Sequence, residues 1–229
     1  MREHTDEVAR TPDPFLEERL ARVDGWLRDG RVPFSSRVIP IGLSLPAQQW
    51  VLPGEQVLGV LRGARVFALA HCICRSHYHR CDHPTEVCFI LNERADRYLQ
   101  VGRGRRVSLE EAQRILQEAD ARGLVHLAIY TPEQQPYAVC SCCACCCHDL
   151  QFLRLYGRSD LIAHSDYIAR TDMESCTHCG RCVERCPFGA RTVEGGKMWY
   201  DGTACYGCGL CASACEAGVT RLQRREVTQ

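Results

Sequence analysis

The sequence has no segment that predicts export or membrane insertion. Its first ten residues are charged and contain no apolar core of the kind found in secretory signals. No run of about 18 apolar residues, the length needed to cross a bilayer, occurs in the chain. We therefore expect a cytoplasmic protein with no membrane span.

The chain also lacks an excess of charge of either sign. Its 28 Lys and Arg residues balance 28 Asp and Glu residues, so the formal net charge is +0. A nucleic-acid-binding domain usually carries a basic excess, and no DNA-binding pair of helices is evident. The sequence contains neither a glycine-rich nucleotide loop nor a nucleophile elbow. We expect no nucleic-acid partner and find no motif for nucleotide-dependent or acyl-transfer catalysis.

Cysteine is what the chain has in quantity. Eighteen of the 229 residues are cysteines, which is several times ordinary usage. In an exported protein so many thiols would predict disulfides, whereas in a reducing compartment they predict bound metal.

Eight of these cysteines belong to one motif that occurs twice. Both copies have the spacing C-x2-C-x2-C-x3-C, and the second lies 29 residues after the first (205 − 176 = 29). A two-cluster ferredoxin has this spacing, and each of its [4Fe–4S] clusters takes three thiolates from one copy and the last thiolate from the other. Two zinc sites are the alternative, but zinc has no need of a third C-x2 step. The expected ligand sets are Cys176, Cys179, Cys182 and Cys215 for one cluster, and Cys205, Cys208, Cys211 and Cys186 for the other.

From about Ser165 to Leu222 the chain resembles a two-[4Fe–4S] bacterial-type ferredoxin domain. The resemblance implies a small α+β unit in which each half is a strand, a cluster loop, one helical turn and a return strand. We expect return strands at 190–193 and 218–222, and a further strand at 197–200. One departure is that Glu216, not proline, follows Cys215. We therefore expect Cys215 to be wetter and closer to a carboxylate, and the two clusters to differ in potential.

Ten further cysteines precede this unit, in the segments HCICRSHYHRCDHPTEVC and CSCCACCCH. Adjacent cysteines rarely form disulfides with each other, and six thiols within eight residues do not form a packing pattern, so these residues predict bound metal. Ten thiolates suffice for one or two more iron–sulfur clusters, and a fused or non-cubane cluster with more than four ligands is the alternative. The candidate ligands are Cys72, Cys74, Cys81, Cys88, Cys140, Cys142, Cys143, Cys145, Cys146 and Cys147.

Histidines and arginines flank these thiols. Because thiolates are already in surplus, we expect these side chains to donate hydrogen bonds to sulfur and to offset cluster charge; histidine ligation is the alternative. The residues are His71, His77, His79, His83, His148, Arg75 and Arg80, with His178 in the same role in the ferredoxin unit.

Residues 38–150 also resemble a domain of iron–sulfur proteins from anaerobic bacteria, where it is fused to this type of ferredoxin. The features that carry the resemblance are VLPGEQV, HCICR, the segment from Cys81 to Cys88, SLEEA…GLVH and the CCxCCC run. This second resemblance implies no settled function.

The expected organisation is an N-terminal arm at 1–36, a cysteine-rich α+β domain at 37–158 and the ferredoxin domain at 159–229. The arm should contain a helix over 15–27, and an extended segment should run from residue 38 to 52. The capping box at Ser108–Glu111 should open a helix that Gly123 ends, followed by a strand at 124–130. Residues 148–158 should link the two domains. The basic turn at 102–106 is either a solvated loop or a docking patch for an acidic redox partner.

Electron transfer is the function that these features predict first. Several [4Fe–4S] clusters would relay low-potential electrons to or from a partner oxidoreductase or a larger complex. The alternative is a reductase that acts on a disulfide, a sulfur species or another small molecule at an unusual N-terminal cluster. A redox or iron sensor ranks last, because no DNA-binding helices are evident.

Overall fold

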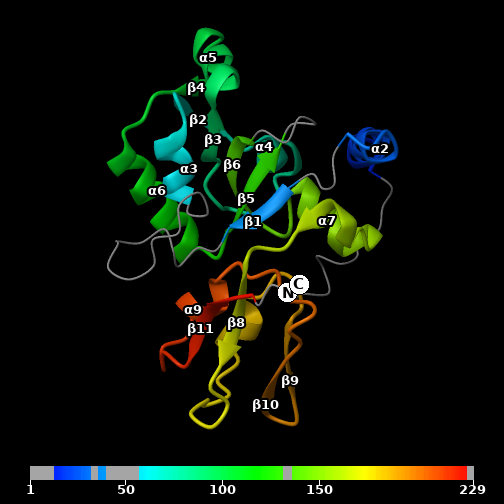
Figure 1. The fold of residues 1–229 in the computed structure, drawn as a ribbon, viewed down its shortest axis with the longest axis vertical. Helices are drawn as coiled ribbons and strands as arrows, with labels where there is room; N and C mark the ends of the chain where they lie inside the picture. The colour runs from blue at the N-terminus through cyan, green and yellow to red at the C-terminus, as the bar shows by residue number, and fades with distance from the viewer. Residues whose placement is uncertain (1–12, 32–35, 40–56, 131–135, 226–229) are drawn as a thin grey trace.

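The computed structural model describes residues 13–31, 36–39, 57–130 and 136–225. Helices and strands are mixed along this part of the chain, as expected for an α+β protein. Figure 1 shows a sheet with its helices at one end of the long axis and the C-terminal strands at the other. Most of the extended segment predicted at 38–52 lies outside the described residues. Only residues 38 and 39 are described, and both belong to a strand.

A seven-stranded sheet organises the larger part, with the strand order β4-β2-β3-β6-β5-β1-β7. Neighbouring strands are antiparallel except β1 and β7, which are parallel. The strands are β1 (Ser36–Ile39), β2 (Phe67–His71), β3 (Glu86–Leu91), β4 (Gly104–Arg105), β5 (Val125–Tyr130), β6 (Pro136–Cys142) and β7 (Ile162–Ala163). The apolar run at 66–70, which periodicity alone leaves open between strand and helix, therefore forms strand β2.

Two helices cover one face of this sheet. α3 (Val57–Gly63) and α6 (Leu109–Ala121) pack against side chains such as Leu69 and Phe89. Each fully buried Leu or Phe side chain here stabilises the fold by about 1.5–3 kcal/mol. The predicted capping box is confirmed, since Ser108 Oγ accepts a hydrogen bond of 3.1 Å from the Glu111 amide. Gly123, with φ +76°, follows the helix end as predicted.

The opposite face of the sheet carries cysteines. Side chains alternate along a strand, so Phe89 and Val139 face the helices α3 and α6, while Cys88 and Cys140 point the other way. These two cysteines are direct partners in the register of β3 with β6. The sheet thus brings together thiols from the two N-terminal cysteine segments, as predicted.

The segment predicted to link the two domains, 148–158, is largely helical, a helix that the sequence did not predict. α7 (His148–Tyr156) buries Phe152 against Leu16 and Val23 of α2 (Pro14–Arg28). Asp13 caps α2, because its Oδ1 accepts hydrogen bonds from the amides of residues 15 and 16 at 3.1 and 3.2 Å. The helix predicted in the N-terminal arm is therefore confirmed, and it packs on α7 at one side of the molecule (Figure 1).

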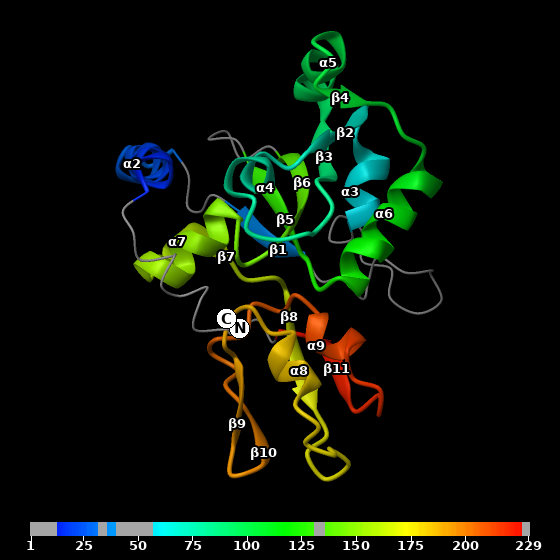
Figure 2. The same cartoon turned by 180° about the vertical axis from the view of Figure 1, so that it is seen from behind.

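The C-terminal part runs twice through the order strand, one-turn helix, strand. The elements are β8 (Tyr167–Thr171), α8 (Arg181–Glu184), β9 (Arg191–Glu194), β10 (Lys197–Tyr200), α9 (Leu210–Ser213) and β11 (Thr220–Arg224). β9 pairs with β10 and β8 with β11, both antiparallel. The predicted strands at 190–193, 197–200 and 218–222 are confirmed to within two residues. Figure 2 shows α8 and α9 together at the end of this part that faces the large sheet.

The two parts share packed side chains. Tyr206, Cys208 and Leu210 lie in one buried cluster with Val125 and Leu127 of β5. Across the same boundary, Arg185 Nη2 donates to the Ala121 carbonyl at 2.8 Å, and Ser213 Oγ donates to Asp120 Oδ1 at 3.3 Å. The C-terminal part therefore docks on the edge of the sheet through apolar and polar contacts. The domain boundaries at 36/37 and 158/159 stay predictions.

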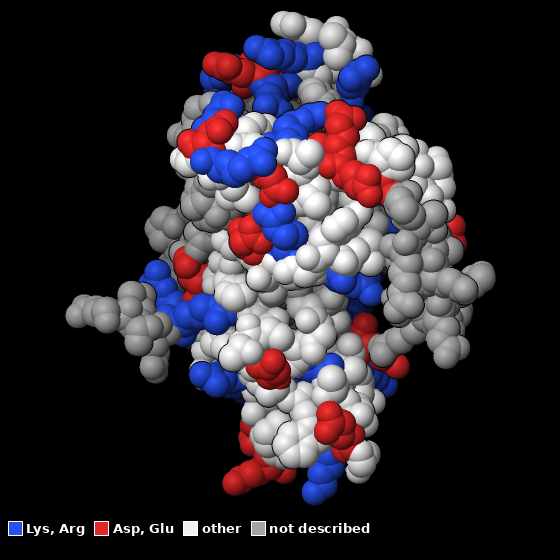
Figure 3. Space-filling model, turned by 90° about the vertical axis from the view of Figure 1, so that its right-hand side faces the viewer, with Lys and Arg blue, Asp and Glu red and all other residues white. Residues whose placement is uncertain are grey.

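The described surface carries charges of both signs. In the view of Figure 3, basic and acidic side chains are interspersed and neither sign forms a continuous field. The predicted loop at 102–106 includes the edge strand β4, where Arg105 pairs with Glu111 at 2.7 Å and Glu86 at 3.4 Å. None of the described helices combines the length and the apolar composition that crossing a bilayer requires.

Candidate iron–sulfur and metal sites

Two cavities in the C-terminal part are lined by the eight motif cysteines. The first cavity is lined by Cys176, Cys179, Cys182 and Cys215, together with residues of the loops around them. Cys179 is exposed, so this cavity reaches the surface. The His178 amide donates to Cys176 Sγ at 3.4 Å, which is the type of N–H···S contact that stabilises a cluster-bound thiolate.

The second cavity is more enclosed. It is lined by Cys186, Cys205, Cys208 and Cys211, and the last three are buried. Tyr200 and Tyr206 also line it, so aromatic side chains cover this cavity. The neighbouring Trp199 is 57% exposed and does not belong to the lining.

The last cysteine of each motif lies at the cavity of the other motif. This exchange arises because each cluster loop ends in a one-turn helix, and the helices α8 and α9 contact each other. Glycines in the left-handed region begin both helices, Gly180 at φ +78° and Gly209 at φ +86°. Eight thiols in two sets of four fit two groups that each need four thiolates, as [4Fe–4S] clusters do.

A buried cation lies between the two cavities. Arg191 is only 3% exposed, and its Nη1 is 3.8 Å from Cys182 Sγ of the first set. Burial opposes its charge, but the thiolates of Cys211 and Cys182 raise the pKa of Arg191. The guanidinium also lies over the Tyr200 ring, 4.6 Å from its centroid. No motif marks this residue, and sequence reasoning missed it.

We expect Arg191→Met to lower the reduction potential of both C-terminal sites by tens of millivolts, since about 59 mV corresponds to tenfold in a one-electron equilibrium. Reduction adds negative charge to a cluster, so a buried cation beside it favours the reduced state. The measurement is a redox titration followed by electron paramagnetic resonance. Arg221→Met, at an exposed position of β11, is the matched control and should leave both potentials in place. Potentials that stay unchanged in the Arg191 variant would contradict this role.

Glu216, the residue in place of the expected proline, forms an ion pair with Arg181. The carboxylate predicted near Cys215 is therefore paired with a cation. Cys215 itself is half-buried. Burial raises its pKa, but hydrogen bonds from the Thr220 side chain and from the backbone of residues 218–220 outweigh this and lower the pKa. The environment of Cys215 thus favours the thiolate form that a metal ligand needs.

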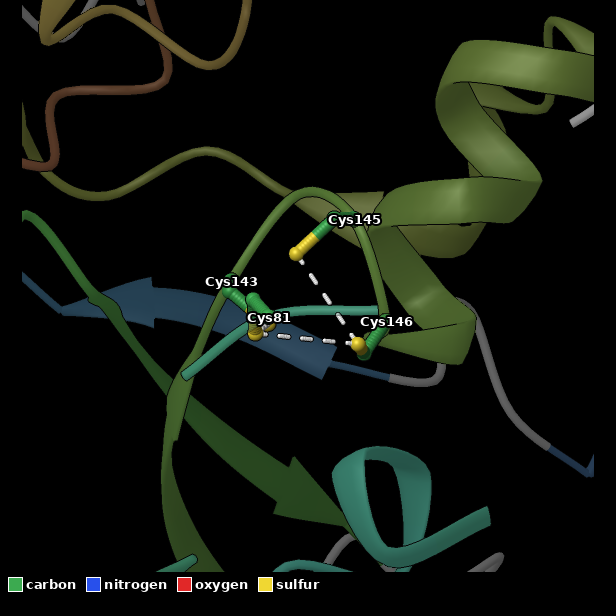
Figure 4. A group of neighbouring side chains, drawn as sticks. All are labelled: Cys81, Cys143, Cys145 and Cys146. Carbon is green, nitrogen blue, oxygen red and sulfur yellow. Dashed lines mark hydrogen bonds between the residues drawn. The ribbon is translucent and has the colours of Figure 1, made fainter. Parts of the chain in front are cut away.

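The ten N-terminal cysteines divide into two groups. Four of them, here called the tetrathiol site, have sulfur atoms that all lie within 4.8 Å of one another: Cys81, Cys143, Cys145 and Cys146. Figure 4 shows these side chains pointing toward a common centre, with Cys81 from the segment after α4 (Ile73–Tyr78) and the others from the loop between β6 and α7. Contacts with Cys143 and Cys145 lower the pKa of Cys146 to about 4, while contact with Cys143 raises that of Cys145. Thiols packed this closely cannot all ionise without a cation.

The other six form what is here called the thiol array: Cys72, Cys74, Cys88, Cys140, Cys142 and Cys147. Side-chain contacts link the six thiols one after another. Cys140 contacts Cys88, Cys88 contacts Cys72, and Cys72 contacts Cys74. Cys74 in turn contacts Cys147, and Cys147 contacts Cys142. Four of the six are at most 6% exposed. The array lies on the sheet face opposite α3 and α6, where the starts of α4 and α7 add Cys74 and Cys147.

Two of the flanking side chains, His148 and Arg75, contact array sulfurs as expected, and two others have different partners. His148 is buried, and its Nδ1 lies 3.3 Å from Cys74 Sγ. Arg75 is 2% exposed, donates to the carbonyls of Pro84 and Ser141, and contacts Cys72 of the array. His178 Nδ1 accepts from the Met198 amide at 3.1 Å, so that nitrogen already has a partner. His71 instead contacts Thr85 Oγ1 at 3.1 Å and is largely exposed.

No disulfide joins the eighteen cysteines, all of which belong to the described part of the chain. The region 169–192 matches a family model described as a 4Fe-4S binding domain. The match contains the first motif, Cys176 to Cys186, and supports a ferredoxin-type domain there. The comparison with curated proteins finds no match to the chain.

Proposed function

We propose that this protein transfers low-potential electrons through several iron–sulfur clusters to or from a partner oxidoreductase. Two [4Fe–4S] clusters are assigned to the C-terminal cavities, each held by the four cysteines that line it. A further iron–sulfur cluster is assigned to the thiol array. The donor sets support this assignment because soft thiolates are ligands of iron–sulfur clusters, and a [4Fe–4S] cluster needs four of them.

The single observation that carries the proposal is the continuity between the array and the second cavity. Cys142 and Cys147 of the array belong to the same buried cluster of side chains as Cys208, a lining residue of that cavity. Leu210 and Tyr206 complete the contact between them. Two redox groups held by these cysteines would therefore lie in contact with one continuous cluster of buried side chains.

The path continues to the surface of the C-terminal part. Arg191 interacts with Cys211 at the second cavity and with Cys182 at the first. The first cavity then reaches solvent at the exposed Cys179. A redox partner that docks at this end would meet the outermost cluster, while the buried array forms the inner end of the path.

The chain's own residues supply position and environment. The clusters, when bound, supply one-electron chemistry. The protein holds the thiolates in fixed sets, excludes water with side chains such as Tyr206 and Leu210, and offsets charge with the buried Arg75 and Arg191. Electron transfer of this kind needs no general acid or base, in agreement with the absence of such a motif from the sequence.

The test is iron and sulfide analysis of the full chain, purified without oxygen, combined with electron paramagnetic resonance at stepwise reduction. We expect more than the roughly eight iron and eight sulfide per chain that two [4Fe–4S] clusters contain. We also expect spin–spin broadening once neighbouring clusters are both reduced, because the sites are adjacent. A sulfide content of eight would contradict an electron path that includes the array, whether or not the signals are broadened, because the two C-terminal clusters would already broaden each other's signals.

A second candidate is a reductase at the array, and one observation favours it. The array has six thiols, two more than a [4Fe–4S] cluster requires. In that case a disulfide or polysulfide added to the reduced protein would be consumed catalytically, and Cys140→Ser/Cys142→Ser would abolish the consumption. A pure electron carrier would show no such turnover with either substrate.

A further inference from the structure

The sulfur atoms of the tetrathiol site lie much closer together than a polynuclear cluster allows. Cys81 Sγ is 3.7 Å from Cys143 Sγ and 3.9 Å from Cys146 Sγ, and the sulfurs of Cys145 and Cys146 are 3.8 Å apart. No pair within the group exceeds 4.8 Å. These distances describe a small tetrahedron of sulfur.

A single ion accounts for a tetrahedron of this size. Four thiolates bound at about 2.3 Å to one tetrahedral ion lie about 3.8 Å from each other, because the edge of a tetrahedron is about 1.63 times its centre-to-corner distance. In a [4Fe–4S] cluster each thiolate binds a different iron atom, and the intervening iron and sulfide hold the thiolates further apart. The three sulfur–sulfur distances therefore match a mononuclear site.

We propose that the tetrathiol site binds one thiophilic metal ion, zinc or iron, without inorganic sulfide. The proposal goes beyond the electron-transfer function, and it assigns four of the ten N-terminal cysteines to a site that is not one of the one or two iron–sulfur clusters expected there. Cys143 and Cys146 form a C-x2-C knuckle, which is a frequent spacing in tetrahedral thiolate sites. Cys81 comes from 62 residues earlier in the chain, and Cys145 closes the site.

The surroundings hold the knuckle in place. The Cys147 amide donates to the Cys143 carbonyl at 3.0 Å and closes the turn. Gln151 Nε2 donates to the Cys146 carbonyl at 3.0 Å, and Arg80 Nη1 donates to Gln151 Oε1 at 2.7 Å. The Arg80 backbone also donates to the Cys146 sulfur. Metal-bound thiolates usually have such supporting hydrogen bonds.

The position suggests a structural role for the ion. The site packs beside Ala119 of α6 and Leu124 before β5. It joins the segment after α4 to the loop that precedes α7, and the neighbouring residues Cys74 and Cys147 belong to the array. Four protein ligands leave no open position, as in structural zinc sites. The ion would fix the two segments that carry part of the array.

The test measures metal and sulfide in the full chain and in two double variants. Cys81→Ser/Cys145→Ser should lose one equivalent of metal and no sulfide, and the element lost tells zinc from iron. The matched control, Cys140→Ser/Cys142→Ser in the array, should retain that equivalent. Loss of that equivalent from the control as well would contradict the assignment of the ion to the tetrathiol site.

Spectroscopy of the unaltered chain provides a second measurement, which does not depend on the variants folding. Zinc-edge X-ray absorption should show four sulfur neighbours at about 2.3 Å and no metal neighbour. If the ion is iron, Mössbauer spectra should contain a single-iron tetrathiolate component. Loss of several irons together with sulfide from Cys81→Ser/Cys145→Ser would overturn the proposal, and so would retention of all metal.

Discussion

We expect removal of the iron–sulfur clusters proposed for the C-terminal part to unfold that part while the large sheet stays folded. The apolar core around the cavities is small. Its buried members are Ala169, Ala190, Cys205 and Cys211, two of which are candidate ligands. In contrast, the core between the sheet and the helices α3 and α6 contains ten buried apolar residues and no cysteine. Binding of the clusters therefore supplies much of the folding free energy of the C-terminal part, on the order of 10 kcal/mol.

Hydrogen exchange followed by mass spectrometry measures this difference. After oxidative removal of the clusters under chelation, amides of β8, β10 and β11 should lose nearly all protection. Amides of β2 and β3 serve as the internal control and should remain protected, because Leu69 and Phe89 pack against α3 and α6 and this packing does not depend on iron. Equal protection of β8 and β11 before and after cluster removal would show that the C-terminal part folds without its metal.

Gly207→Ala should lower the thermal midpoint of the loaded protein by about 10 °C, which corresponds to about 3–5 kcal/mol at this chain length. Gly207 has φ +72°, and an added Cβ would lie 2.0 Å from the Tyr167 carbonyl oxygen and 2.3 Å from Ser165 Oγ. Ser165 Oγ donates to the Gly207 carbonyl at 3.0 Å and is buried, so it cannot move aside. The left-handed backbone adds about 1–3 kcal/mol of strain for any residue with a side chain.

Gly218→Ala is the matched control for this substitution. Gly218 also lies beside a cluster cysteine and has φ +66°, but an added Cβ would meet nothing within 4 Å. The Gly218→Ala variant should lose only the free energy that the left-handed backbone costs a residue with a side chain, about 1–2 kcal/mol. Calorimetry or cluster absorbance during heating gives both midpoints. If the two variants lose the same stability, the short distance between residue 207 and β8 does not explain why this position needs a glycine.

The sequence predicted the C-terminal sites better than the N-terminal ones. Its repeated spacing already implies the exchange of Cys186 and Cys215, because a short loop reaches only three corners of a cluster. The division of the other ten cysteines could not be predicted in this way. It depends on contacts between distant parts of the sequence, such as Cys88 with Cys140 in the register of β3 with β6 and Cys81 with Cys143 outside these strands.

Local signals explain which elements were found. Ser108 and Gly123 mark the ends of α6 with backbone-specific chemistry, so that helix was predictable. α7 was missed because its buried face includes His148 and Gln151, which interrupt the apolar periodicity. No pattern in a single sequence marks Arg191, because its importance comes from its position in the fold. It is 3% exposed and lies between the two cavities.

The long sequence separation inside the tetrathiol site has a consequence for biosynthesis. A ribosome adds roughly 5–20 residues per second, so Cys81 waits several seconds for Cys143, which follows 62 residues later. The ligand sets are completed in a fixed order as the chain emerges, first the tetrathiol site at Cys146, then the array at Cys147, the second cavity at Cys211 and the first at Cys215. Metal delivery to the nascent chain can therefore proceed from the buried end of the proposed electron path toward its exposed end.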